Sequence, residues 1–168
     1  MEKIDKIMEI AKKANKYLER SNINVPILEG LKLINVEDNN VIFVASDGNV
    51  MEQFLTDGEL NSDSFKERIE KNVTSSYEIV NNLNSSCNIN FLKDYKTDYF
   101  NFKIYNQEII INNSKTIRQL VAYFVDSRSN YFYEITLSCG VKTNDNLEMD
   151  SIMKLFFSVL DNTKYFLY

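Results

Sequence analysis

The sequence predicts an α+β domain in which an antiparallel sheet is flanked by helices. Segments with helical periodicity lie near both ends and in the middle of the chain, while residues 88–139 alternate with period two. At 168 residues the chain has the length of one domain. We therefore expect a single domain over residues 1–168, with an amphipathic helix at 1–22 and the sheet and other helices at 28–168.

The first elements follow from periodicity and turn residues. Residues 2–20 carry apolar side chains every three or four positions between charged ones, which predicts a helix with one apolar stripe. Pro26 then resists helix formation and favours an extended chain before it. Two β-branched runs, 31–36 and 41–46, enclose turn-forming residues and predict a hairpin.

A second helix is predicted from about residue 64 to residue 84. Ser64 followed by Glu67 matches a capping box, in which each side chain satisfies a free amide at the helix start. Apolar side chains continue at helical spacing from Phe65 to Leu83. We expect this helix to pack by one face.

The central region predicts several antiparallel strands. Phe100, Phe102 and Ile104 alternate with polar residues, and Asn106-Gln107 is a possible turn before a further strand at 108–111. Two stronger runs follow at 116–125 and 131–139, and the residues between them predict a tight hairpin connection. We expect one face of this sheet to be core and the other to be partly wet.

A last helix is predicted from about residue 145 or 146. Its apolar side chains wrap more of the circumference than a surface helix needs. The chain ends in Tyr165-Phe166-Leu167-Tyr168, an apolar terminus that we expect to dock on its own domain or on a partner.

Composition excludes several function classes. The chain has no histidine, which removes serine–histidine and cysteine–histidine catalysis, histidine zinc sites and the usual proton shuttle near neutral pH. A formal net charge of −5 and an isoelectric point near 4.9 argue against a nucleic-acid partner. The glycines occur singly and form no phosphate-binding motif. We expect no cofactor and no metal.

Acidic residues suggest two candidate sites, a calcium-binding loop and a pair of catalytic carboxylates. Asp57, Glu59, Asn61 and Asp63 alternate like calcium-loop ligands, but Ser62 and Arg68 stand where such a loop needs glycine and glutamate. An acidic loop before a helix explains the same residues. A carboxylate-dependent hydrolase using Glu108 and Glu134 is a second hypothesis, because both lie on strand-like segments and could face each other.

Targeting features point to a cytoplasmic location. No signal-like or membrane-spanning apolar stretch is visible, since the longest apolar runs are four or five residues. Cys87 and Cys139 lie far apart without metal spacing, so a disulfide framework is not expected.

Aromatic residues supply the candidate binding surface. They form two groups along the strands, and alternation should leave some of them for an open sheet face, although core packing explains many of them. Arg118, on one of these strands, could bind an anionic ligand. The candidate surface residues are Tyr99, Tyr105, Arg118, Tyr123, Phe132 and Tyr133.

The order of elements from about residue 28 resembles the PsbP-like α/β sandwich. The strands at 114–125 and 131–138, followed by the helix through 153–157, carry the resemblance. That superfamily includes photosystem extrinsic proteins, a small Ran-binding nuclear import factor and many bacterial proteins, often lipoproteins. The helix at 2–20 departs from the family layout. No catalytic motif matches, so the resemblance implies a fold and carries over no functional residue.

These observations favour a non-catalytic binding or adaptor protein. We expect it to use the aromatic sheet face or the apolar helix stripe to bind a protein partner, a second copy of itself or a small ligand. Besides the hydrolase, a small chaperone or immunity-type protein whose acidity covers a basic partner is an alternative, because complementary charge speeds encounter.

Overall fold

The computed structural model describes residues 23–28, 31–35, 43–46, 50–83, 85–111, 115–141 and 146–165. The predicted helix at 2–20 lies outside these ranges. Within them the chain forms nine strands and two helices. In chain order they are β1 (Ile23–Asn24), β2 (Lys32–Asn35), β3 (Phe43–Ser46), β4 (Val50–Glu59), α2 (Phe65–Asn82), β5 (Ser85–Lys96), β6 (Asn101–Ile111), β7 (Lys115–Asp126), β8 (Tyr131–Val141), α3 (Asn146–Asp161) and β9 (Lys164–Tyr165).

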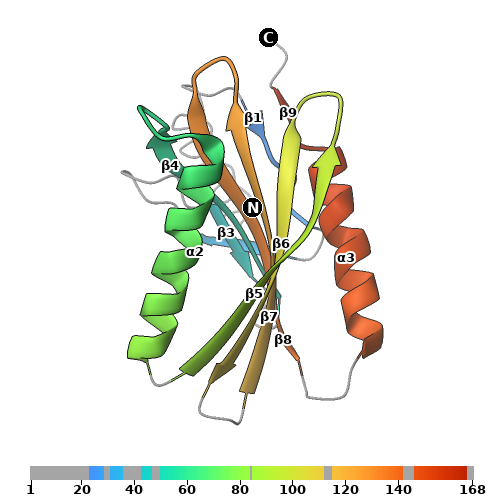
Figure 1. Ribbon diagram of the computed structural model, residues 1–168. Coiled ribbons are helices and arrows are strands. Elements are labelled where there is room, and N and C mark those ends of the chain that lie inside the picture. The colour runs from blue at the N-terminus through green and yellow to red at the C-terminus, as the bar shows by residue number, and fades with distance from the viewer. Residues whose placement is uncertain are drawn as a thin grey trace.

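Seven strands make one antiparallel sheet in the order β2-β3-β4-β8-β7-β6-β5. The helices α2 and α3 lie on opposite faces of this sheet (Figure 1). The predicted α+β class, with an antiparallel sheet flanked by helices, is therefore confirmed. The expectation of a partly wet face needs correction, because a helix packs against each face.

The larger core lies between the sheet and α3. Phe54, Phe124 and Ile135 from the strands meet Phe156 and Leu160 of α3, and all five side chains are almost fully buried. The wide apolar circumference predicted for the last helix fits this position, because several of its turns face the sheet.

The smaller core lies beneath α2. Ile69 of α2 and Leu60 pack on Val121, Tyr123 and Phe132 of the sheet. The predicted capping box is present at the start of α2: the Glu67 amide donates to Ser64 Oγ at 3.1 Å, and the Glu67 carboxylate accepts from the Ser64 amide at 3.5 Å. The helix thus begins where the sequence indicates.

Strand pairing confirms both predicted hairpins and corrects one predicted turn. β2 pairs with β3, and β7 pairs with β8 from Thr116 to Asp126. Asn106 and Gln107, predicted as a turn, instead continue β6 and lie opposite Leu120 and Gln119 of β7. A polar residue suits position 107 because Gln107 is buried and donates to Cys87 Sγ, so its side-chain amide has a partner inside the sheet.

The strand β4 is the main element that the sequence pattern did not indicate. It joins β3 to β8 and so connects the two halves of the sheet. Its sequence VMEQFLTDGE includes a turn-like Asp-Gly pair, and the pairing with β8 shifts register between Thr56 and Gly58. Gly58 has φ +81°, a conformation that favours glycine, so the irregularity is built into the strand.

The end of the described chain docks on its own domain. β9 pairs with β1, and the Tyr165 hydroxyl donates to Asp126 Oδ1 at 2.6 Å. Burial and the Asp126 carboxylate raise the pKa of Tyr165 to about 12. In the part of the chain that the structure describes, no helix has both the length and the apolarity needed to cross a membrane.

Candidate functional site

The structure buries three of the five aromatic residues predicted for the binding surface. Tyr123 and Phe132 belong to the core under α2, with stacked rings 5.5 Å apart, and Tyr133 lies in the core under α3, stacked on Phe54 and Phe124. Each of the three predicted side chains is at most 5% exposed. Their assignment to a surface is wrong, because alternation sends them to two faces and a helix covers both.

Tyr105 and Tyr99 keep more contact with solvent. Tyr105 is partly buried and makes edge contacts with Phe91 and Tyr123, so it continues the aromatic row of the α2 face toward the sheet edge. Burial raises the pKa of the Tyr105 hydroxyl. Tyr99, between β5 and β6, is 46% exposed and contacts the Tyr165 ring. The structure does not bring Tyr99 and Tyr105 together as one surface.

The predicted carboxylate pair is divided between the two faces. Glu108 of β6 lies opposite Arg118, which in turn lies opposite Cys139 in the core under α3. Glu134 of β8 lies opposite Tyr123, whose ring belongs to the core under α2. The sheet therefore separates the carboxylates, and they cannot flank one substrate bond as a glycosidase pair does.

Arg118, the remaining candidate, lies at the end of β7 nearest the β6–β7 connection, on the α3 side of the sheet. Its side chain is partly buried, and its Nε atom is buried without a hydrogen-bond partner. Arg118 thus differs from a freely solvated surface arginine.

Sequence reasoning missed Glu52, the most strongly perturbed carboxyl group described. Glu52 lies on β4 opposite Leu137 and is 2% exposed, and its Oε1 accepts from the Leu28 amide at 2.9 Å. Burial raises the pKa of Glu52 to about 7, although the Leu28 hydrogen bond opposes this shift. The carboxyl group holds residues 25–28 against the sheet. Recognition of β4 as a strand would have placed Glu52 on the inner face with Phe54.

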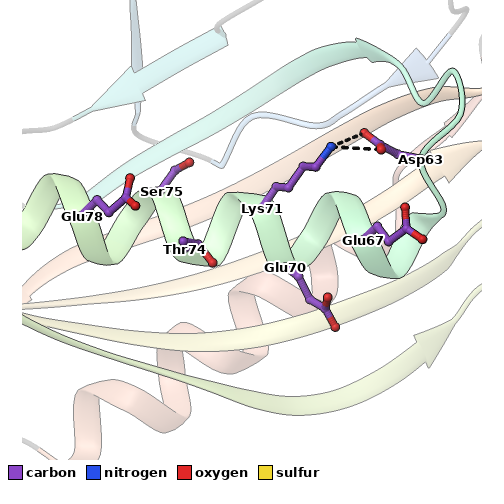
Figure 2. Close-up of a pocket in the computed structure, with 7 residues that line it drawn as sticks. All are labelled: Asp63, Glu67, Glu70, Lys71, Thr74, Ser75 and Glu78. Atoms are coloured by element: carbon purple, nitrogen blue, oxygen red, sulfur yellow. Dashed lines mark hydrogen bonds and ion pairs between the residues drawn. The ribbon is translucent and has the colours of Figure 1, made fainter.

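An acidic pocket runs along the outer face of α2, on the side away from the sheet (Figure 2). Its carboxylates come from residues one helical turn or two apart, and Lys71 reaches back to the Asp63 carboxylate with both distances 3.0 Å. Arg68 also bonds Asp63, at 3.3 Å. The lining residues are Asp63, Glu67, Glu70, Lys71, Thr74, Ser75 and Glu78.

The charges of this pocket are only partly balanced. Hydrogen bonds and charge from Lys71 lead the effects that lower the pKa of Asp63. Glu70 and Glu78 are exposed and form no ion pair with any residue that the structure describes. The outer face of α2 is therefore a fixed row of solvent-facing carboxylates with one lysine among them.

The calcium-loop spacing has another structural meaning. Glu59 ends β4, Asn61 adopts φ 54°, and Asp63 bridges to α2, so the residues lead the chain into the helix. Among the described residues no group of three or more acidic or cysteine side chains could hold a metal ion. Cys87 and Cys139 are both free thiols, and burial raises the pKa of Cys87.

Comparison with known proteins identifies the fold. No protein-family model matches the chain, and no curated protein sequence matches it. Among solved structures, the chain is similar to the solution structure of CyanoP, the cyanobacterial PsbP from Synechocystis sp. PCC 6803. The match covers 88% of each chain with a TM-score of 0.62 and 9% sequence identity. The predicted PsbP-like fold is confirmed, and at this identity the likeness concerns the fold alone.

The same comparison corrects the expected location. The prediction of a cytoplasmic location does not stand, because it rested only on missing apolar segments, and one solved structure with this fold is a cyanobacterial PsbP. The likeness to this structure gives no support for a cytoplasmic location.

Proposed function

We propose that the protein is a non-catalytic binding protein that receives a basic protein partner on the outer face of α2. The observation that carries this proposal is the pocket along α2, where exposed Glu67, Glu70 and Glu78 extend the acidic surface beyond the paired Asp63. A row of like charges on a rigid helix attracts a partner of opposite charge and speeds encounter.

Apolar side chains beside this acidic face support a protein as the partner. Ile79 and Leu83, near the carboxyl end of α2, are 61% and 68% exposed. Protein interfaces combine a desolvated apolar centre with a polar rim, and these two residues supply apolar area at the end of α2 that also carries Glu78. The aromatic residues of the strands are poorer candidates for the partner-binding surface, because most of their rings are buried in the two cores.

Charge reversal of the α2 face tests the proposal. The triple variant Glu67→Lys, Glu70→Lys, Glu78→Lys should lose capture of basic proteins from the native cell, while the unaltered protein captures them in a salt-sensitive manner. Asp98→Lys with Asp150→Lys is the control, because both aspartates are exposed and lie off α2. Equal capture by the triple variant and the control would contradict the proposal.

A further inference from the structure

An aromatic row runs across strands β8, β7, β6 and β5 on the α2 side of the sheet. It consists of Phe132, Tyr123, Tyr105 and Phe91, and the centroids of neighbouring rings lie 5.5, 5.6 and 5.4 Å apart. Phe132 and Tyr123 are buried in the core, but Phe91, on the edge strand β5, is 52% exposed. The outer end of this row is therefore accessible to another molecule.

Cations approach this row at both of its ends. Arg68 of α2 places its guanidinium carbon 5.9 Å from the centroid of the buried Phe132 ring. Lys103 of β6 places its ammonium nitrogen 5.8 Å from the centroid of the Phe91 ring. Such distances are typical of cation–π attraction, in which the electron-rich face of a ring meets a positive charge. The row therefore has the chemistry to bind a positive side chain, and at Phe91 much of the residue remains open to solvent.

One carboxylate near the exposed end of the row has no partner. Lys103 bonds the Asp94 carboxylate at 2.9 Å, so these two charges balance each other. Within the described ranges Glu70 of α2 forms no ion pair, and it forms none with Lys66, four residues earlier on the same helix. The charge of Glu70 is therefore available to a cation from outside.

Glu70 also lies close to Tyr105. Figure 2 shows that its side chain leaves α2 on a different side from Lys71. Burial is the largest cause of the raised pKa of Tyr105, and the charge of Glu70 is among the effects that add to it. The Tyr105 hydroxyl has no hydrogen-bond partner among the described residues, so its oxygen can accept from a donor. A free carboxylate and an accepting hydroxyl thus accompany Phe91, whose ring contacts Tyr105 directly.

We propose that Glu70, Tyr105 and Phe91 bind an arginine side chain of the basic partner at the sheet edge beside α2. This inference rests on the proposed function and names the residue type by which the partner is recognised. The planar guanidinium stacks on the exposed ring of Phe91 and donates to the Glu70 carboxylate and the Tyr105 hydroxyl. A lysine ammonium carries the same charge but cannot stack as a plane or bond both carboxylate oxygens in parallel, so arginine is preferred.

Two synthetic peptides of equal charge and length test this preference. One peptide alternates arginine with serine, and the other has lysine in place of each arginine. Both carry a fluorescein label, and fluorescence polarisation measures their dissociation constants with the full chain at low ionic strength, where exposed charges are least screened. The arginine peptide should bind about fivefold more tightly than the lysine peptide.

Two variants, each with a matched control, locate the preference. Phe91→Leu keeps an apolar side chain without a ring and should reduce the preference to about twofold or less. Tyr99→Leu removes another exposed ring, between β5 and β6, and should leave the preference unchanged. Glu70→Gln should weaken the arginine peptide more than the lysine peptide, since a bidentate contact is lost. Glu78→Gln removes the same charge elsewhere on α2 and should weaken both peptides equally.

Equal affinity of the unaltered protein for the two peptides would overturn the arginine site and leave the proposed function intact, because the α2 face would then attract any basic chain. An undiminished arginine preference in Phe91→Leu, or the same loss of preference in Tyr99→Leu, would also overturn it. If neither peptide bound, the proposed function would fail together with the arginine site. Circular dichroism spectra like that of the unaltered protein verify that each variant folds.

Discussion

At Glu52, a single buried carboxyl group makes stability depend on pH. Its pKa is about 7 in the folded chain against an ordinary value of 4.5, because burial disfavours the charged form. Between these values the folded state holds a proton that the unfolded state releases. The stabilising contribution is therefore complete below about pH 4.5 and is lost as the pH rises through about 7.

We expect Glu52→Gln to remove this dependence. Glutamine stays neutral at all these pH values, and its carbonyl oxygen can still accept from the Leu28 amide. The free energy of unfolding should match that of the unaltered protein near pH 4.5 and exceed it at pH 8 by up to about 3 kcal/mol. Urea denaturation at both pH values measures the difference.

The matched control is Glu78→Gln on the exposed face of α2. It should leave the difference between the two pH values as it is in the unaltered protein. If Glu52→Gln destabilised the protein equally at both pH values, Glu52 would act as an ordinary hydrogen-bonding group and the pH argument would be wrong.

The helix α2 is an element whose start depends on one local motif. Ser64 Oγ accepts from the Glu67 amide, and the Glu67 carboxylate accepts in return from the Ser64 amide. Ser64→Ala should therefore lower the free energy of unfolding by about 1 kcal/mol, because amides at the helix start lose their partner. Thermal or chemical denaturation measures the loss.

Ser75→Ala provides the comparison within the same helix. Ser75 is exposed in the middle of α2, where alanine is the better helix former, so this variant should be unchanged or slightly more stable. A loss as large for Ser75→Ala as for Ser64→Ala would show that serine content, and not capping, determines the effect.

The whole sheet keeps the two cysteines apart. Cys87 of β5 lies opposite Ile109 and bonds Gln107 on the α2 side, whereas Cys139 of β8 belongs to the core under α3. We expect no intramolecular disulfide in the folded protein, since the backbone sheet stands between the thiols. Cys87 should react with a thiol reagent before Cys139, which is 4% exposed.

Mass spectrometry after timed labelling checks both statements. In denaturant the two thiols should react at similar rates, which establishes that the difference comes from the fold. An internal disulfide formed without unfolding, or equal labelling of Cys87 and Cys139 in the native protein, would contradict the arrangement of the sheet.

Local signals allowed most elements to be predicted, and they also explain the misses. The capping box located α2, and the turn residues at 126–130 located the β7–β8 hairpin. Asn106-Gln107 resembles a turn, but pairing with β7 and the Cys87 contact keep both residues in β6. The Asp-Gly pair in β4 likewise resembles a turn, and a register shift accommodates it.

The amino-acid sequence alone establishes the α+β class, because alternation and helical spacing are local properties of the chain. It also determined the exclusion of histidine chemistry. The side of the sheet on which each side chain lies follows only from strand pairing and helix packing. Tyr123 and Tyr133 look alike in the sequence, yet they enter different cores, and Glu108 and Glu134 are separated by the sheet. Strand order brings Arg118 beside Glu108 and Asn106, and such pairing depends on contacts distant in the chain.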